Sequence, residues 1–134
     1  MKEFIDQLRW RGMLHDVIPG SEEYLSKNKT IGYIGFDPTS DSLHIGSLVP
    51  IFILKHFQNA GHTPVVLLGG ATGMIGDPSG KSDERNLLDK NILKFNEKKL
   101  KVQFEKFLDF KSNKSNKAIL VNNYDWMSKF SIID

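Results

Sequence analysis

Residues 35–48 form a polar run with one histidine and two glycines, GFDPTSDSLHIGSL. A strand-like segment precedes this run and a helix-length segment follows it, so the run should join a strand to a helix. The start of a helix presents unpaired N–H groups and a partial positive charge, which favour a bound phosphate. His44 adds an imidazole that could donate to a phosphate oxygen, and Gly46 would let a flat base lie against the backbone. The run therefore predicts a nucleotide-binding helix start.

A second candidate is the glycine-dense run at residues 69–81, GGATGMIGDPSGK, whose backbone could approach a ligand closely. Its end resembles a phosphate-binding P-loop, but three residues separate Gly76 from Gly80 where that motif has four. The run also opens with glycines, so the Gly76 segment does not follow directly on its strand. A P-loop is therefore disfavoured, and we expect Lys81 and Arg85 on a solvated loop.

Two short β-prone segments, residues 30–36 and 63–68, lead into these runs and are predicted to be strands. The second is continuously apolar, which predicts a strand buried on both faces. Residues 48–60 are long enough for a helix, provided that Pro50 lies in its first turn, and Gly61 is placed to end it. The order strand, helix, strand is typical of a parallel crossover, in which ligands bind at the carboxyl ends of the strands.

Further elements flank this unit. Apolar residues at helical spacing predict a helix over residues 2–11, and Ser21 is the predicted N-cap of a short second helix. An amphipathic pattern predicts a helix over residues 91–110, and residues 117–121 form a third expected strand that completes a second crossover. The predicted fold is therefore α/β, a Rossmann-like parallel sheet with flanking helices.

The composition limits the classes of function. The 134 residues are 40% apolar and 25% charged, as in a globular domain, and contain no cysteine, which excludes disulfides and thiolate metal sites. No apolar run reaches the ~18 residues of a membrane span, and acidic residues interrupt the start, where a secretory signal would be apolar. We therefore expect a cytoplasmic protein without a membrane partner.

Charge is distributed unevenly along the chain. Residues 81–117 hold eleven Lys or Arg against six Asp or Glu, whereas the remainder holds seven against ten. A basic segment could bind RNA, so a basic RNA-binding fragment stays open as an alternative. Lysines spread around a helix are more often a solvated face, and that interpretation is favoured.

Four blocks of sequence together resemble the class I aminoacyl-tRNA synthetases, and specifically their tyrosyl members. The first is residues 33–47, where Asp-Pro-Thr is followed after two residues by Ser-Leu-His-Ile-Gly, as in the first ATP-binding motif of the class. The second is the glycine run at 69–81, and the others are LRWRG at residues 8–12 and NYDW at residues 123–126. The blocks occur in the family's order and cover nearly the whole chain. The family usually has a second histidine where this chain has Ser47.

The resemblance implies ATP-dependent activation of L-tyrosine to tyrosyl-adenylate and its transfer to tRNA(Tyr). ATP would be a substrate accompanied by Mg²⁺, with no tightly bound cofactor and no metal held by the protein. The resemblance also implies a catalytic pair that holds the outer phosphates, an adenylate-binding set and a tyrosine-binding set. The catalytic pair is Thr39 and His44. The adenylate-binding set is Gly35, Asp37, Gly46 and Ser47, and the tyrosine-binding set is Tyr33, Leu67, Thr72 and Asp77.

Several parts of the family do not occur in this sequence. It contains no Lys-Met-Ser-Lys-Ser type loop, none of the later residues that complete the tyrosine pocket, and no anticodon-binding region. We therefore divide it into an N-terminal helical segment, 1–29, and the first part of the Rossmann-like catalytic domain, 30–134, truncated at its C-terminal end and expected to be inactive alone. The complete enzyme is expected to be a homodimer. Two alternatives stay open: a non-catalytic nucleotide- or tyrosine-binding module, and the sister tryptophanyl enzyme.

Overall fold

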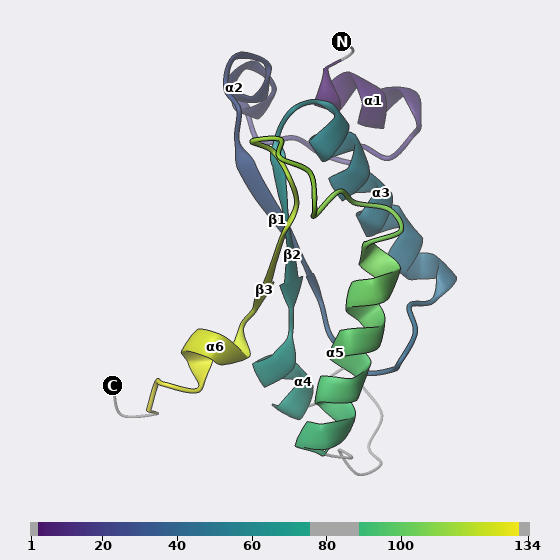
Figure 1. Cartoon of the computed structure of the whole chain (residues 1–134). Coiled ribbons are helices and arrows are strands. Elements are labelled where there is room, and N and C mark those ends of the chain that lie inside the picture. Colours follow the sequence, from purple (N-terminus) through teal and green to yellow (C-terminus); the bar gives the residue numbers. More distant parts are fainter. Residues whose placement is uncertain (1–2, 76–88, 132–134) are drawn as a thin grey trace.

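The computed structural model describes residues 3–75 and 89–131, and in this part of the chain a parallel sheet has three strands. β1 (Ile31–Phe36) pairs with β2 (Thr63–Leu68), and β2 pairs with β3 (Ile119–Asn122). The strands follow one another across the sheet in chain order, so both crossovers advance in the same direction (Figure 1). The predicted α/β fold with parallel strands is confirmed.

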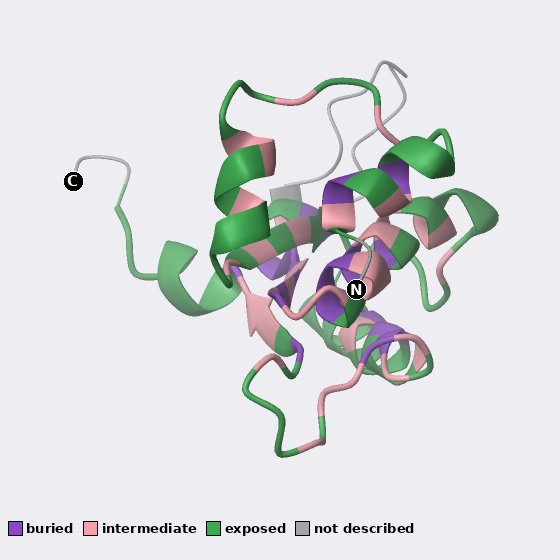
Figure 2. Cartoon of the chain, turned by 90° about the horizontal axis from the view of Figure 1, so that it is seen from above, coloured by how far each residue is buried: buried purple, intermediate pink, exposed green. Residues whose placement is uncertain are grey.

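Two long helices cover one face of this sheet. α3 (Ile45–Asn59) joins β1 to β2, α5 (Lys90–Phe104) lies between β2 and β3, and both lie on the same side of the strands (Figure 1). Buried side chains of this sheet face and of the helices form one core, and Figure 2 shows the buried positions gathered on the inner faces. Its most deeply buried members include Ile51, Val66, Leu100 and Phe104. Each such side chain stabilises the fold by about 1.5–3 kcal/mol, so this core fixes the strand ends relative to the helices.

The other face of the sheet is open in the described part of the chain. Tyr33 and Ile119 on this face are 70% and 41% exposed. In β2, Val66 on the core side is buried, whereas Leu67 on the other side is only half-buried. The prediction that this strand is buried on both faces is therefore wrong, because the two long helices cover only one side.

α3 begins three residues earlier than predicted, at Ile45, with His44 as its N-cap. Pro50 therefore lies inside the helix and not in its first turn. Proline lacks the N–H that would bond to the carbonyl four residues back, so the carbonyl of Gly46 loses its helical partner. Gly61, with a φ of 96°, follows the end of the helix as predicted.

Two further segments differ from the predicted elements. The glycine-dense run begins as a short helix, α4 (Gly70–Ile75), because side chains at the end of β3 accept hydrogen bonds from its first N–H groups. α5 begins after Asp89, whose carboxylate is its N-cap, and it ends at Phe104, short of the predicted residue 110. Beyond Phe104 the chain turns, and Leu108 reaches the core from that turn, which explains why the apolar pattern outlasts the helix.

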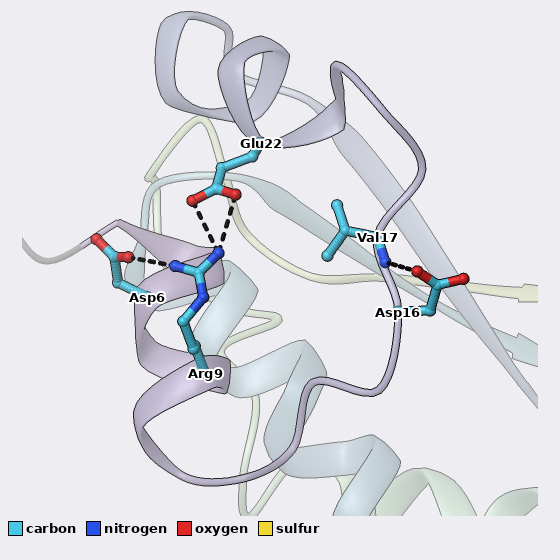
Figure 3. A network of polar contacts seen from close by, with 5 residues as sticks. All are labelled: Asp6, Arg9, Asp16, Val17 and Glu22. Carbon is cyan, nitrogen blue, oxygen red and sulfur yellow. Dashed lines mark hydrogen bonds and ion pairs between the residues drawn. The ribbon is translucent and has the colours of Figure 1, made fainter.

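The N-terminal segment contains α1 (Phe4–Trp10) and α2 (Ser21–Lys27). Arg9 joins the two helices, because its guanidinium donates to the carboxylates of Asp6 and Glu22 at 2.9–3.0 Å (Figure 3). All three side chains are about half exposed, so these contacts orient α2 against α1 more than they stabilise the fold.

Glycines lie just beyond the end of α1 and at the start of α2. Gly12 follows α1 with a φ of 66°. Gly20, with a φ of 86°, occupies the N-cap position of α2, so Ser21 is the first helical residue and not the predicted cap. A left-handed backbone at residue 20 moves the helix start by one position.

The remaining described elements are short or solvated. α6 (Tyr124–Met127) follows β3 directly. Lys94, Lys98, Lys99 and Lys101 of α5 are all exposed, as expected for a solvated face. Within the described ranges, none of the helices is long and apolar enough to cross a membrane.

Candidate nucleotide-binding site

A cavity of about 370 Å³ lies where the carboxyl end of β1 meets the start of α3. Its lining includes all six residues predicted to bind or activate ATP. These are Gly35, Asp37, Thr39, His44, Gly46 and Ser47. A strand and the helix that follows it meet at the carboxyl edge of a parallel sheet, which is where such folds bind ligands. The structure thus brings the six residues together, and their individual roles stay predictions.

His44 has a defined orientation at the edge of this cavity. Its Nδ1 accepts a hydrogen bond from the N–H of Gly46 at 3.1 Å, which makes it the N-cap of α3. A neutral imidazole that accepts through Nδ1 carries its proton on Nε2. The side chain is exposed, so the Nε2–H group is a donor to an anionic ligand, and the cap bond fixes the direction in which it points.

The ring of His44 also explains why residue 46 is glycine. A Cβ atom added at Gly46 would stand 2.9 Å from Cε1 and 3.0 Å from Nδ1 of His44. That approach is too close for carbon, so any side chain at this position would displace the imidazole from its cap. The planar group that lies against this backbone is therefore the chain's own histidine, and the approach of a base stays a prediction.

A chain of hydrogen bonds connects the ends of all three strands. Thr72 Oγ1, on α4, donates to Oδ1 of Asp37 at 2.7 Å, and Asn123 Nδ2, after β3, donates to Thr72 Oγ1 at 3.2 Å. Oδ1 of Asn123 accepts from the N–H of Ala71 at 2.7 Å. Gly69 lies against this network, and a Cβ there would overlap the carboxylate of Asp37 and the hydroxyl of Thr72. The close packing of the network therefore requires glycine at residue 69.

Asn122, the last residue of β3, holds the start of α4. Its Oδ1 accepts from the N–H groups of Gly70 at 3.1 Å and Tyr124 at 3.0 Å, and its Nδ2 donates to Glu97 at 2.8 Å. The predicted site omits both Asn122 and Asn123. Their position at the carboxyl end of a predicted parallel strand is the signal that could have included them.

The predicted tyrosine-binding residues lie in different places. Tyr33 and Leu67 are on the open face of the sheet, on adjacent strands and two register positions apart, since Leu67 pairs with Gly35. Neither lines the cavity. Thr72 joins the ATP set through the network at the strand ends. Asp77 lies outside the described residues.

Two histidines with lowered pKa values lie away from the cavity. Burial, and to a lesser extent the charge of Lys29, lowers the pKa of His62 below its usual 6.5. Burial and, to a lesser extent, the charge of Arg11 lower the pKa of His56, which lies in the last turn of α3.

In the described part of the chain, no group of three or more His, Asp or Glu side chains could hold a metal ion. The side chains that line the cavity offer a ligand the Nε2–H of His44 and the hydroxyls of Thr39 and Ser47.

Comparison with known protein families gives the class of the chain. The family described as tRNA synthetases class I (W and Y) matches residues 25–134, which is most of the chain. The chain therefore belongs to the class I tRNA synthetases of the tryptophan and tyrosine group. The resemblance indicated by the four motif blocks is confirmed.

The most similar curated relatives include tyrosyl members of this group. The chain is 60% identical over 131 residues to the tyrosine–tRNA ligase of Bacteroides fragilis, which covers 98% of this chain and 30% of the relative. It is also 60% identical over 134 residues to the tyrosine–tRNA ligase of Flavobacterium psychrophilum, which covers 100% of this chain and 31% of the relative. The chain thus spans less than a third of the length of these relatives. The tryptophanyl alternative is not favoured.

Two solved structures share the fold. A C-terminally truncated Aspergillus nidulans mitochondrial tyrosyl-tRNA synthetase superimposes with a TM-score of 0.77 at 27% identity, covering 99% of this chain and 41% of that one. The corresponding truncated enzyme of Coccidioides posadasii gives a TM-score of 0.73 at 29% identity, covering 99% and 38%. The predicted fold of a class I catalytic domain is therefore confirmed.

Proposed function

We propose that the protein containing this chain activates L-tyrosine with ATP to tyrosyl-adenylate and transfers the tyrosyl group to tRNA(Tyr). The observation that carries the proposal is the convergence of six residues on one cavity at the start of α3. It is supported by 60% identity to proteins named tyrosine–tRNA ligase. A non-catalytic binding module is less favoured, because the cavity offers donors suited to a developing negative charge as well as to a bound nucleotide.

In this proposal, Thr39 and His44 bind the outer phosphates of ATP. The carboxylate of tyrosine attacks the α-phosphorus, the bond to the bridging oxygen of the β-phosphate breaks, and pyrophosphate leaves with the electron pair. No protein side chain needs to act as a nucleophile. A donor fixed where negative charge develops is worth about two to three orders of magnitude in rate. The cap bond of His44 supports this role, because it holds Nε2–H in one direction before ATP binds.

The adenylate would be held by Gly35, Asp37, Gly46 and Ser47. The first three line the cavity, and the N-terminus of α3 adds the partial positive charge of the helix dipole. The hydroxyl of Ser47 could bind a ribose or phosphate oxygen, but it carries no charge. We therefore assign it a neutral hydrogen bond in place of the histidine that is usual in the family.

The tyrosine substrate would be bound by Tyr33, Leu67, Thr72 and Asp77. Tyr33 would bond the phenolic hydroxyl, Leu67 would line the ring pocket, and Asp77 would pair with the ammonium group near Thr72. A site that bonds a hydroxyl rejects an analogue without it, because the polar group of the site would remain unpaired. The hydrogen bond from Thr72 to Asp37 supports an amino-acid site that adjoins the ATP cavity.

The remaining parts of the proposal concern partners and organisation. Mg²⁺ would arrive with ATP, held mainly by phosphate oxygens and water, as this ion usually is in nucleotide enzymes. We also propose a cytoplasmic homodimer, and a division of the chain into residues 1–29 and 30–134. We propose no RNA contact for the exposed lysines of α5.

Tyrosine-dependent exchange of pyrophosphate into ATP tests the proposed function in the full-length protein. We expect exchange with tyrosine and none with tryptophan or phenylalanine at the same concentration. Exchange driven by tryptophan would assign the protein to the sister enzyme. Binding of ATP and tyrosine without any exchange would favour the non-catalytic module.

A further inference from the structure

Two amide side chains interrupt the apolar stripe of α5. Asn96 and Gln103 lie seven residues apart, and therefore on the same face of the helix as the buried Leu93, Leu100 and Phe104. Asn96 is only 4% exposed. An amide removed from water costs free energy unless it is hydrogen-bonded, so these residues depend on the partners they find in the protein.

Both amides bind the backbone of the loop between β1 and α3. Asn96 Nδ2 donates to the carbonyl of Pro38 at 2.9 Å, and Pro38 is itself fully buried. Gln103 Nε2 donates to the carbonyl of Asp41 at 3.1 Å, and its Oε1 accepts from the N–H of Leu43 at 3.0 Å. The loop has no regular secondary structure, so these bonds from α5 fix three of its backbone groups.

The three hydrogen-bonded backbone groups are close in sequence to the two residues to which we assign the outer phosphates. Thr39 lies between Pro38 and Asp41, and His44 follows Leu43 directly. A catalytic donor is effective only in the right position, and a displacement of roughly 1 Å can lower a rate about a hundredfold. The shape of this loop should therefore matter more to the reaction than to the stability of the fold.

We infer that Asn96 and Gln103 are positioning residues that hold the phosphate-binding loop, and through it Thr39 and His44, in the geometry that ATP requires. This inference rests on the proposed function. Neither amide lines the cavity or falls within the four motif blocks, so neither is expected to touch the substrate. Each acts on the site through the loop backbone.

A matched control exists at the other end of the sheet. Gln58 of α3 donates through Nε2 to the carbonyl of Asp109 at 2.9 Å, and its Oε1 accepts from the N–H of the same residue at 3.0 Å. It is 7% exposed and, like Gln103, binds one backbone carbonyl and one backbone N–H of a loop, in this case the loop before β3. Gln58→Met and Gln103→Met therefore remove the same chemistry from two loops, of which only one carries site residues.

The experiment measures pyrophosphate exchange and thermal unfolding of the full-length variants Gln103→Met, Asn96→Leu and Gln58→Met. We expect Gln103→Met to lower kcat for exchange by roughly ten- to a hundredfold, with the KM for tyrosine unchanged. Asn96→Leu should act in the same direction if it folds, and Gln103→Met remains the decisive variant if it does not. Gln58→Met should lower Tm at least as much while leaving kcat within about twofold.

A double-variant cycle separates positioning from a general loss of structure. If Gln103 acts through Thr39 and His44, the effect of Gln103→Met should be smaller in a His44→Asn background, since one of the two groups it positions is already gone. Additive losses in the cycle would overturn the inference. So would equal losses of kcat in Gln103→Met and Gln58→Met.

Amide hydrogen exchange distinguishes this inference from the proposed function. In Gln103→Met, backbone amides of residues 39–44 should exchange faster than in the unsubstituted protein, whereas Gln58→Met should leave them unchanged. A wild-type protein without tyrosine-dependent exchange activity would refute the proposed function, and the hydrogen-exchange result would still decide whether the amides hold the loop. If the amide hydrogen exchange rates of residues 39–44 do not change in Gln103→Met, the positioning role is refuted even when the enzyme is active.

Discussion

At the carboxyl ends of the strands, Gln103 fastens a loop whose side chains are largely exposed, whereas at the opposite end Gln58 fastens a loop whose polar groups bond to one another. Thr39 and His44 in the first loop are both exposed. In the second loop, Asn116 Nδ2 donates to the carbonyl of Gln58 at 2.8 Å, and Gln58 binds back to the Asn116 carbonyl at 3.3 Å. The same type of clamp thus serves two different ends of one sheet.

The comparison teaches where function can reside in this fold. Throughout the described residues, no buried side-chain nitrogen or oxygen lacks a hydrogen-bond partner, so the interior is satisfied at both ends. The difference lies at the surface, because the end of the sheet next to the start of α3 keeps a fixed donor, the Nε2–H of His44, that faces solvent. Stability should therefore depend mainly on the Gln58 end, and activity mainly on the His44 end.

The strongest test of this division is His44→Asn. Asparagine is a good N-cap, so the start of α3 should be preserved, but the Nε2–H donor is lost. We expect the rate of pyrophosphate exchange by the full-length protein to fall about a hundredfold with little change in Tm. As a comparison, His44→Ala should show the same loss of rate and an additional loss of about 1 kcal/mol in unfolding free energy. A His44→Asn protein with normal exchange would show that the predicted phosphate role is wrong.

Gln58→Met tests the opposite end. It leaves the backbone groups of Asp109 and a carbonyl of Asn116 without their buried partner, so the unfolding free energy should fall by about 2 kcal/mol. Urea denaturation measures this loss, and the exchange rate per folded molecule should stay close to that of the unsubstituted protein. An intact Tm together with impaired exchange would reverse the roles assigned to the two ends.

The smallest expected effect is a pH dependence of the unfolding free energy, which arises at the Gln58 end of the sheet. The pKa of His62 is lowered in the folded protein by burial and by Lys29, so the unfolded chain binds a proton more readily below the usual value of 6.5. Stability should therefore be complete above pH 6.5 and decrease as the pH falls below it. Urea midpoints between pH 7.5 and 5.5 measure this slope. His62→Phe, which retains an aromatic ring against Phe57, should reduce the slope, and an unchanged slope would assign it elsewhere.

Local patterns predicted the elements better than their surroundings. The expected strands over residues 30–36 and 63–68 occur as β1 and β2 with nearly the same bounds, because strand propensity and turn residues act over short stretches. The start of α3 was predicted too late because the cap at His44 depends on a ring that folds back on Gly46. The open face at Tyr33 could not be predicted, since it depends on which side the helices cover.

The candidate site divides in the same way. Six residues of the cavity were predicted from the family resemblance, and they lie together because they occupy one run of sequence and the end of its preceding strand. Asn123 and the amides Asn96 and Gln103 were missed, although amides within an apolar helical stripe are a signal that sequence reasoning could use. Their partners lie far away along the chain, since Asn96 and Pro38 are 58 positions apart.

The order of strands and helices, the chemistry of the motif around His44 and the family could therefore all be predicted from the amino-acid sequence. Each of these depends on residues that are close together in the chain or on the types of residue in a short motif. The bonds from α5 to the loop between β1 and α3, and the contact of Thr72 with Asp37, appear only in the folded chain. The physical reason is that such contacts form only after α5 packs on the sheet, and the spacing of residues within one segment does not specify the backbone atoms that a distant side chain will reach.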